Sequence, residues 1–213
     1  MGGAGKESAQ PNGPPESERD GRIFTGDGAD TRPSNGGCRR PARPRAMSGA
    51  GSPHRVGTRL EYFHDPSAPR PTVLVPVAFA VVRDDRGRVL LCRRADTGNW
   101  EMPGGSVNAG ESALDAVQRE VEEETGVLIT VTGASGIYTD PGYVIVYPTG
   151  EVRQQFAVCF HARPTAGAIR QDCQETAQVG WIRPDQLDRF PIHPGVRVRL
   201  DAALADPDHV HLA

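Results

Sequence analysis

The sequence predicts an α/β fold in which a mixed β-sheet is covered by helices. Runs rich in β-branched and aromatic residues, separated by turn residues, recur between residues 73 and 182. One segment without Pro or Gly, residues 112–125, interrupts these runs and has helical periodicity. A second periodic segment follows the last run. Strands, a central helix, further strands and a late helix bury their apolar faces in a layered arrangement.

Composition limits the class of protein. The 213 residues suffice for one domain with a core, and the net charge of −3 argues against a dedicated nucleic-acid partner. The longest apolar run, Val73–Val82, is broken by Pro76 and is too short to span a bilayer, so no membrane partner is expected. The first residues lack the charged-then-apolar order of a signal peptide.

The N-terminal part predicts no packed structure. Residues 1–46 are rich in Gly, Pro, Ser and Arg without apolar periodicity, which is typical of a disordered tail. Two hypotheses stay open: its basic end is an electrostatic arm for an anionic partner, or residues 1–46 as a whole are upstream sequence preceding a true start at Met47. Residues 47–72 read as an extended lead-in with several prolines, although residues 59–64 could form a short strand. The folded domain is then expected over residues 73–205, with a C-terminal tail at 206–213.

The strands are predicted from alternation and turn signals. Residues 74–83 form a buried strand, a turn follows, and residues 88–93 return as its partner. Residues 127–138 form a strand with an irregularity at Gly133 or Gly136, and residues 143–147 and 152–162 form a hairpin. Residues 164–176 read as a loop and 178–182 as a strand. Pro184 starts a short helix, and residues 196–204 form an amphipathic one.

The four cysteines indicate the compartment. Cys38, Cys92, Cys159 and Cys173 include no CxxC pair and no zinc-ligand spacing. Cys92 and Cys159 lie in apolar strand patterns, which predicts buried thiols and favours a reducing cytoplasm.

The central segment has the sequence signals of a loop, followed by a helix and a glycine that ends the helix. Gly105 and Gly110 bracket a loop that leads to Glu111. The helix that follows carries apolar residues at helical spacing, and Gly126 stands where a helix ends on a left-handed residue.

An acidic face is predicted on this helix. Glu120, Glu123 and Glu124 stand at i, i+3 and i+4, so their like charges repel unless something positive lies among them. Arg119 neutralises part of this charge, and a hard divalent cation that binds carboxylate oxygens would neutralise the rest. The alternative is a solvated acidic surface.

The segment resembles the Nudix box, G-x5-E-x7-R-E-U-x-E-E-x-G-U with U apolar. All nine defined positions match: Gly105, Glu111, Arg119, Glu120, Val121, Glu123, Glu124, Gly126 and Val127. Met102-Pro103-Gly104-Gly105 also resembles the usual entry to the box. The resemblance implies a Nudix-type α/β/α sandwich.

The resemblance also implies roles for these residues. Glu120 and Glu124 are the expected ligands of Mg²⁺ or Mn²⁺, with Glu123 close behind and the Gly105 carbonyl as a further ligand. Three box residues are expected to be structural: Glu111, Arg119, which orients the carboxylates, and Gly126. The general base stays open between a carboxylate of the box helix, Glu120 or Glu123, and Glu175 in a later loop.

Substrate contacts are expected from the neighbouring strands. Arg93 and Arg94 point to opposite faces of a strand, so one faces the cleft, and we favour Arg93 as a phosphate clamp. Tyr143 is a candidate for stacking on a base, although an aromatic residue in a strand usually belongs to the core.

These features predict a pyrophosphohydrolase that cleaves a nucleoside diphosphate linked to another group and releases a nucleoside monophosphate plus a phosphorylated product. Its substrate would be a nucleotide-type small molecule: a nucleoside triphosphate, an oxidised one, ADP-ribose or a nucleotide sugar. The alternative is a regulatory module that binds a nucleotide without turnover, against which the complete carboxylate set argues. A homodimer is compatible with the resemblance.

Overall fold

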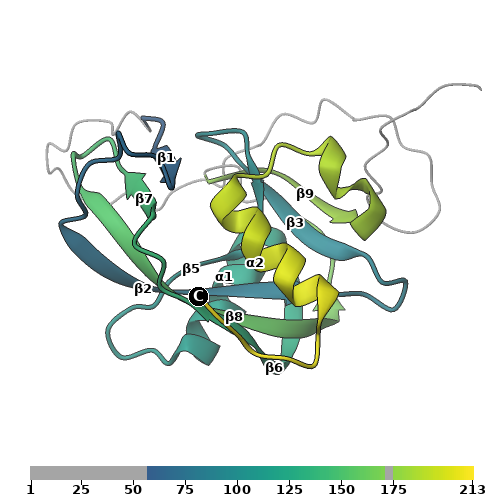
Figure 1. The fold of residues 1–213 in the computed structure, drawn as a ribbon. Helices are drawn as coiled ribbons and strands as arrows, with labels where there is room; N and C mark the ends of the chain where they lie inside the picture. The colour runs from purple at the N-terminus through teal and green to yellow at the C-terminus, as the bar shows by residue number, and fades with distance from the viewer. Residues whose placement is uncertain (1–56, 171–174) are drawn as a thin grey trace, which may run out of the picture.

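The computed structural model describes residues 57–170 and 175–213 (Figure 1). The elements, in chain order, are β1 (Leu60–Phe63), β2 (Val73–Val82), β3 (Val89–Arg94), β4 (Trp100–Glu101), β5 (Gly104–Ser106), α1 (Ala113–Thr125), β6 (Val127–Tyr138), β7 (Tyr143–Val146), β8 (Val152–Gly167), β9 (Thr176–Ile182), the 3-10 helix η1 (Pro184–Arg189), α2 (Pro194–Ala205) and β10 (His211–Leu212). The predictions for residues 1–46, for a start at Met47, and for Cys38 and Cys173 fall outside the described residues.

The long strand β8 organises the larger sheet. One edge of β8 pairs in parallel with the whole of β2, and its other edge pairs antiparallel first with β7 and then with β6. β1 extends this sheet beyond β7, β5 pairs with β2, and β10 pairs in parallel with β6. A smaller antiparallel sheet has the order β4-β3-β9. The predicted mixed sheet is therefore confirmed.

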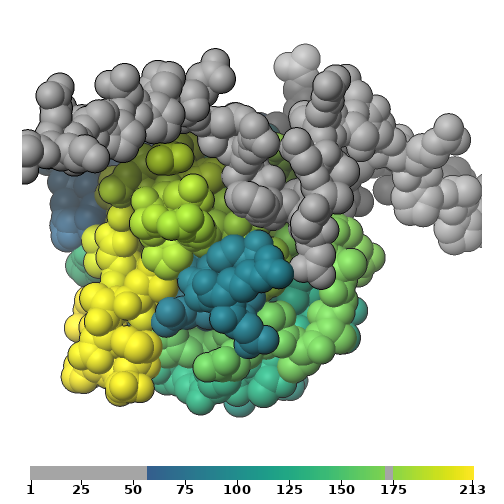
Figure 2. All heavy atoms as spheres, turned by 90° about the vertical axis from the view of Figure 1, so that its right-hand side faces the viewer, coloured from purple at the N-terminus to yellow at the C-terminus, as the bar shows by residue number. Residues whose placement is uncertain are grey.

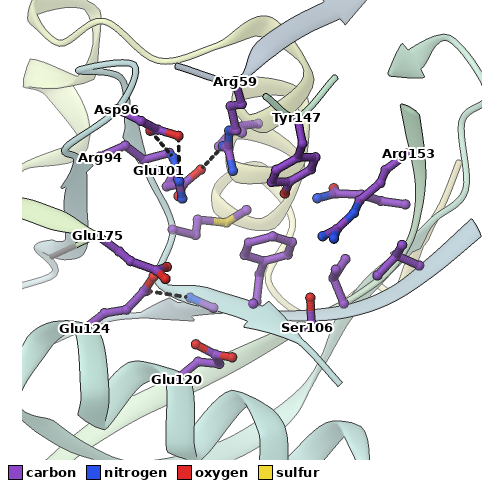
Figure 3. A pocket seen from close by; sticks show the side chains of 18 of the residues that line it. Arg59, Arg94, Asp96, Glu101, Ser106, Glu120, Glu124, Tyr147, Arg153 and Glu175 are labelled. Atoms are coloured by element: carbon purple, nitrogen blue, oxygen red, sulfur yellow. Dashed lines mark hydrogen bonds and ion pairs between the residues drawn. The ribbon is translucent and has the colours of Figure 1, made fainter. Parts of the chain in front are cut away.

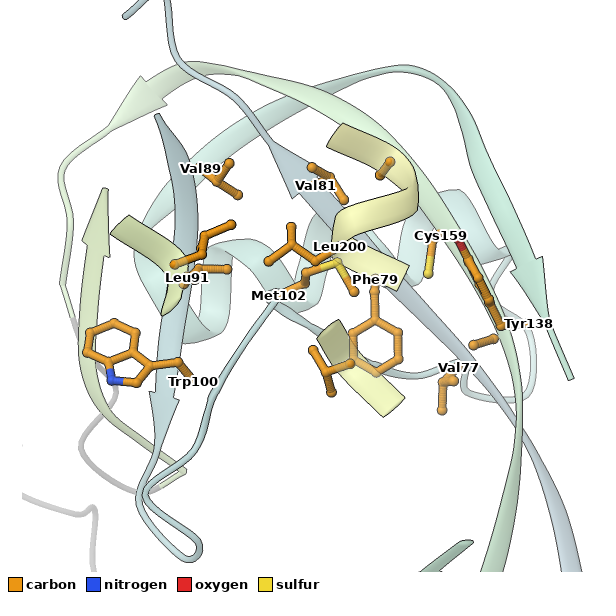
Figure 4. Packing of buried hydrophobic residues seen from close by; sticks show 14 of the residues in the cluster. Val77, Phe79, Val81, Val89, Leu91, Trp100, Met102, Tyr138, Cys159 and Leu200 are labelled. Carbon is orange, nitrogen blue, oxygen red and sulfur yellow. The ribbon is translucent and has the colours of Figure 1, made fainter. Parts of the chain in front are cut away.

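Alternation along β2 explains the layers, because neighbouring side chains point to opposite faces of a sheet. Val77, Phe79 and Val81 enter one apolar cluster with Leu200 of α2 (Figure 4). Ala78, Ala80 and Val82 enter a second cluster with Val117 and Val121 of α1. Figure 1 shows α2 in front of the strands and α1 behind them. The sheet is thus buried on both faces, as in the predicted α/β/α sandwich.

The C-terminal segment closes one side of the molecule. On α2, Val196, Leu200 and Ala203 are buried, which confirms the predicted amphipathic helix. Figure 2 shows η1 and the C-terminal residues, in yellow-green to yellow, covering a continuous part of the surface. Residues 206–213, expected as a tail, return to the sheet because His211–Leu212 pairs with β6. Residues 59–64 likewise contain a strand, β1.

Two strand predictions are wrong. β3 is not the sheet partner of β2, since only the Arg83–Val89 bridge joins them and β3 pairs instead with β4 and β9. Val89–Cys92 is buried on both faces, and a continuous apolar run of this kind carries no information about which strand lies beside it. Residues 164–176 are not all loop, because β8 runs to Gly167 alongside the start of β6.

Other local predictions are confirmed. The register of β6 against β8 shifts between Val131 and Gly133 and again between Ala134 and Gly136, so both glycines mark irregularities. Cys92 and Cys159 are free and buried, and burial raises the pKa of both thiols. Among the described residues, no helix has the length and apolar character needed to cross a membrane.

Candidate active site

The helix that carries the acidic residues has fixed ends. Ser112 is its N-cap and accepts a hydrogen bond from the Asp115 amide, while the Asp115 carboxylate accepts one from the Ser112 amide. Gly126 ends the helix in the left-handed region at φ 73°, and its amide donates to the Glu122 carbonyl at 2.8 Å. The predicted helix and its glycine stop are confirmed. These caps fix the rotation of α1, which determines where its glutamates point.

The glycine strand β5 lies directly against this helix. A Cβ atom at Gly105 would stand 2.7 Å from the Glu120 carboxyl carbon, so only glycine lets the backbone come so close to that side chain. Gly104 has φ 149°, and a Cβ there would stand 2.2 Å from the Ala78 carbonyl oxygen. The two glycines therefore serve different contacts, Gly105 toward α1 and Gly104 toward β2.

Glu124 is a buried carboxylate, with 6% of the residue exposed. Its Oε2 accepts a hydrogen bond from the Gly104 amide at 3.0 Å and lies 3.7 Å from the Cys92 thiol. Burial, together with the charge of Glu101 nearby, raises the pKa of Glu124 to about 8. Within residues 57–170 and 175–213, no basic side chain forms an ion pair with it. A cation bound beside Glu124 would therefore stabilise its ionised form.

Arg119 connects the remaining box glutamates. Its guanidinium binds both oxygens of Glu111, at 2.6 and 3.0 Å, and pairs with Glu120 at 2.9 Å and Glu123 at 3.1 Å. It also donates to the Ser106 carbonyl at 3.2 Å. Arg119 therefore holds α1 to β5 and to the preceding loop, which is the arrangement that the sequence led us to expect.

Glu111 and Glu120 respond to Arg119 in different ways. Hydrogen bonds from Arg119 and from the Asn108 amide lower the pKa of Glu111 to about 2. Burial raises the pKa of Glu120, although Arg119 acts in the opposite direction. Glu111 is thus a fixed counter-charge, whereas Glu120 is half-buried at the cavity. Glu123 has a side chain that is 58% exposed and leans toward Arg119.

A cavity of about 710 Å³ extends from α1 and β5 to β8 and α2. Figure 3 shows Glu120, Glu124 and Glu175 on one side of it and Tyr147 and Arg153 on the other. Glu175, predicted from its place in a loop before β9, lines the cavity on the acidic side, and its carbonyl accepts a hydrogen bond from the Ala95 amide. The cavity therefore has an acidic end and a basic, aromatic end.

Arg94, rather than Arg93, lines the cavity. Arg93 is exposed and donates to the Gly98 carbonyl and to Gln178, so the expectation that it faces the cleft is wrong. A register shift between Arg93 and Arg94 interrupts the pairing of β3 with β9, and alternation alone could not foresee which side each arginine takes. Arg94 binds Asp96 at 2.7 Å and Glu101 at 3.1 Å.

The lead-in contributes a wall residue that the sequence did not reveal. Arg59, just before β1, is 7% exposed and pairs with Glu61 and Glu101, each at 2.9 Å. Its Nε is buried without a hydrogen-bond partner. Glu101 thus joins two arginines that are distant in the sequence, Arg59 and Arg94. The segment before residue 73 has no pattern that would place Arg59 at this site.

Tyr143 belongs mainly to the core. Its ring is buried and stacks on His193 at 5.3 Å, and its hydroxyl donates to Glu61 at 2.9 Å. It touches the cavity wall but has no free ring face comparable to that of an exposed stacking residue. The caution that strand aromatics usually pack inside the protein was appropriate.

The basic end of the cavity was also missed from the sequence. Arg153 of β8 lies over the Tyr147 ring at 4.1 Å and pairs with Glu151. Arg199 of α2 is 4% exposed and donates to Gln155 of β8 at 2.8 Å. A polar residue on the buried face of an otherwise apolar helix was the available signal for Arg199, because such a residue needs a specific partner.

The carboxylates alone do not enclose an ion. Within the described ranges, no group of three His, Cys, Asp or Glu side chains converges closely enough to hold a metal. Glu120 and Glu124 border the same glycine strand, with the carboxylate of Glu120 close to Gly105 and that of Glu124 bonded to Gly104. The oxygen donors present are therefore two carboxylates and a backbone that approaches them closely.

A mixed sheet between two helices, with an acidic capped helix facing a glycine strand at a cavity, defines a class of α/β proteins with an acidic centre on the central helix. The chain belongs to the NUDIX domain family, whose model matches residues 73–202. This membership confirms the resemblance of the box and makes the protein a Nudix hydrolase by family.

The relatives agree with this membership. A MutT-like protein of Streptomyces ambofaciens is 40% identical over 53% of this chain and 66% of its own length. A putative 8-oxo-dGTP diphosphatase of Bacillus subtilis is 33% identical over 54% of this chain and 70% of its own length. The crystal structure of an ADP-ribose pyrophosphatase from Streptococcus suis has a TM-score of 0.52 at 21% identity, covering 65% of this chain and 98% of that one. The last similarity concerns the fold alone.

Proposed function

We propose that this protein is a Mg²⁺- or Mn²⁺-dependent pyrophosphohydrolase. It cleaves a nucleoside diphosphate linked to another group and releases a nucleoside monophosphate and a phosphorylated product. The observation that carries the proposal is the Glu124 carboxylate, buried beside Glu120 at the cavity wall with no basic partner among the described residues. Burial raises the pKa of this carboxyl, and a cation bound beside it would stabilise the ionised form.

The donor set fits a hard divalent cation. Glu120 and Glu124 supply carboxylate oxygens, and Gly105 brings backbone close to Glu120. Mg²⁺ prefers oxygen ligands, keeps several waters and shares the phosphates of its substrate. Two carboxylates and a backbone carbonyl are therefore enough protein ligands, although three side chains do not converge. Glu123 lies on the exposed side and would contribute to a second ion or to positioning.

The chain's own residues have distinct tasks in this proposal. A bound divalent cation would neutralise the diphosphate and acidify the attacking water. Arg119 holds Glu120 in place through its fork to Glu111, as positioning residues around ligands do. Glu175 lines the acidic end and is our candidate for the base that takes the proton from water. Arg94 and Arg59 form the wall on this side and are held by Glu101.

A nucleoside triphosphate, ordinary or oxidised, is the first substrate to test. The name of the Bacillus subtilis relative, a putative 8-oxo-dGTP diphosphatase, supports this choice. ADP-ribose and nucleotide sugars are the other compounds that share the diphosphate. A protein that only senses a nucleotide would bind one of these compounds without turnover.

The test is a phosphate-release panel with the full chain. It contains nucleoside triphosphates, 8-oxo-dGTP, ADP-ribose and nucleotide sugars, each with Mg²⁺, with Mn²⁺ and with EDTA. The helper enzymes, inorganic pyrophosphatase and phosphatase, act in a second step, after the protein has been removed and Mg²⁺ restored. Reactions without the protein correct for direct attack by the helpers. We expect metal-dependent turnover that Glu120→Gln abolishes without loss of the fold. If a compound binds but none is turned over, the protein is a nucleotide sensor and the proposed hydrolase is wrong.

A further inference from the structure

Arg199 is a buried cation that forms no ion pair with the described residues. The residue is 4% exposed and lines the cavity, and its guanidinium lies over Tyr143, Tyr138 and Phe79 at 5.1, 5.6 and 5.7 Å from the ring centres. Among the described residues no carboxylate pairs with it. The rings offset part of the cost of burial, but they leave the in-plane N–H groups to be satisfied by something else.

Gln155 accepts a hydrogen bond from one of these N–H groups, and this bond fixes the orientation of the Gln155 amide. The Nη1 of Arg199 donates to the Gln155 Oε1 at 2.8 Å. A guanidinium has only donors, so the amide oxygen must face it, which turns the amide NH₂ of Gln155 elsewhere. Gln155 is 9% exposed and lines the cavity, and its NH₂ has no hydrogen-bond partner within the described part of the chain. Arg199 and Gln155 together thus present donors to the cavity.

Gln155 lies away from the glutamates along β2, and the Arg199 guanidinium reaches from Gln155 to the Phe79 ring. Gly104 pairs with Phe79 of β2, whereas Gln155 pairs with Val75, four residues earlier on the same strand. That separation is about 13 Å along the strand. Arg153 and Gln155 are two residues apart on β8 and point to the same face, and Figure 3 shows Arg153 and Tyr147 opposite Glu120 and Glu124. The cavity can hold phosphates at one end and a planar base at the other.

The chemistry of this end selects among bases. Tyr147 lines this end, and the Arg153 guanidinium lies over one face of its ring. None of the acidic residues labelled in Figure 3 lies at this end. Guanine and hypoxanthine present two adjacent acceptors, O6 and N7, and uracil presents O4. Adenine and cytosine place an amino donor at the corresponding position. A donor facing a donor leaves both groups unsatisfied in a buried place.

We propose that Arg199 and Gln155 form a base-recognition site that favours keto bases (guanine, hypoxanthine, uracil, thymine) over amino bases (adenine, cytosine). This assignment rests on the proposed function, because it takes the phosphates to lie at the acidic end. The expected discrimination is roughly tenfold or more, the effect of leaving buried polar groups unpaired.

The experiment compares matched pairs that differ at one position, ITP with ATP and UTP with CTP. Binding to the full chain is measured by calorimetry in EDTA, where nothing is hydrolysed and the phosphate repulsion is the same within each pair. The values of kcat/KM with Mg²⁺ are measured separately. We expect the keto member of each pair to bind at least about tenfold more tightly and to have the higher kcat/KM.

Two variants test the residues. Gln155→Glu replaces the NH₂ donor by an acceptor, so the keto preference should fall to near one or invert. Arg199→Met keeps the apolar stem and removes the donors, so the preference should also fall. Arg197→Met is the matched control on the same helix, because Arg197 pairs with Asp188 and Asp201 outside the cavity. It should keep the wild-type ratio, and circular dichroism checks the fold of each variant.

The outcomes separate this inference from the proposed function. Turnover of the panel with ratios within twofold for both pairs overturns the base site and leaves the hydrolase intact. A keto preference in EDTA without turnover overturns the hydrolase and supports the base site. A third outcome is that the keto and amino members of each pair bind equally, while inorganic phosphate binds and Arg199→Met abolishes that binding. This outcome would show that this end of the cavity takes an anionic group instead of a base. If no nucleotide is bound and none is hydrolysed, both the base site and the hydrolase are overturned.

Discussion

The Glu124 carboxylate accepts a 3.0 Å hydrogen bond from the backbone amide of Gly104, which joins the acidic helix to the glycine strand. This bond satisfies one lone pair of a carboxylate that also borders the cavity and lies 3.7 Å from the Cys92 thiol. The same amide bond would hold a neutral oxygen equally well. Replacing the Glu124 carboxylate by a neutral amide therefore tests whether Glu124 is needed for metal binding or for folding.

Glu124→Gln should separate these two roles. Without metal the variant is expected to be as stable as the wild type or more stable, because the neutral amide keeps the acceptor oxygen and replaces a carboxyl whose ionised form burial already disfavours. Metal at a hundred times its Kd should raise the Tm of the wild type by roughly 5–10 °C and leave that of the variant unchanged. Thermal unfolding with EDTA and with Mg²⁺ measures both. A variant that loses several degrees in EDTA would make Glu124 a structural residue.

The two adjacent glycines should respond differently to alanine. Gly104→Ala places a Cβ against the Ala78 carbonyl oxygen at a φ that disfavours side chains, so it should destabilise the fold by about 2 kcal/mol or more. Gly105→Ala meets only the end of the Glu120 side chain, which can move, so the fold should persist while metal affinity and turnover fall. Urea unfolding and Mn²⁺ titration check the pair. Equal destabilisation by both substitutions would contradict the distinction.

The box helix could be predicted because its signals are local. The caps at Ser112 and Gly126, the apolar spacing and the charges of α1 all lie within a few turns, where chain geometry alone determines which groups meet. The pairing of Arg119 with Glu111 follows from the same short range. Strands β2, β3, β6 and β9 and the hairpin of β7 and β8 were also predicted, from alternation and turn signals, although β3 was given the wrong partner.

The rest of the site depends on contacts between distant segments. Arg59 meets Glu101 across 42 residues, and Arg199 meets Gln155 across 44, and neither pair has a sequence pattern. The assignment of β3 to a second sheet depends on which apolar run packs beside it, which hydrophobicity does not specify. Which of Arg93 and Arg94 faces the cavity depends on how β3 packs in the fold, and the pairing of β3 with β9 is irregular at this point. Tertiary packing, and no local rule, decides these features.

Glu101 should be important for stability. It accepts hydrogen bonds from Arg59 and Arg94, and its own residue is 5% exposed. Glu101→Gln leaves two largely buried guanidinium groups with less counter-charge, and we expect a loss of about 2–3 kcal/mol in the free energy of unfolding. The matched control is Asp185→Asn, which removes an exposed acid paired with Arg183 and should change stability by less than about 0.5 kcal/mol. Urea unfolding at pH 7 measures both, and similar losses would refute the structural role of Glu101.

The pH dependence of stability should report the pair of Glu111 with Arg119. The pKa of Glu111 is lowered to about 2 in the folded protein from an ordinary value of 4.5. A lowered pKa means that the folded state favours the ionised form, so this stabilisation is complete above about pH 4.5 and is lost as the pH falls toward 2. Replacing Glu111 by Gln removes the contribution at every pH. The stability difference between the wild type and Glu111→Gln should therefore be constant above pH 5 and shrink steadily below pH 4.5.

The measurement is a series of urea midpoints between pH 7 and pH 2.5 in EDTA, so that metal binding does not contribute. Glu122→Gln is the matched control, since Glu122 lies exposed on the same helix and forms no ion pair with the described residues. Its difference from the wild type should stay flat across the series. A difference for Glu111→Gln that is equally flat down to pH 2.5 would mean that Arg119 does not hold Glu111 in solution as it does in the structure.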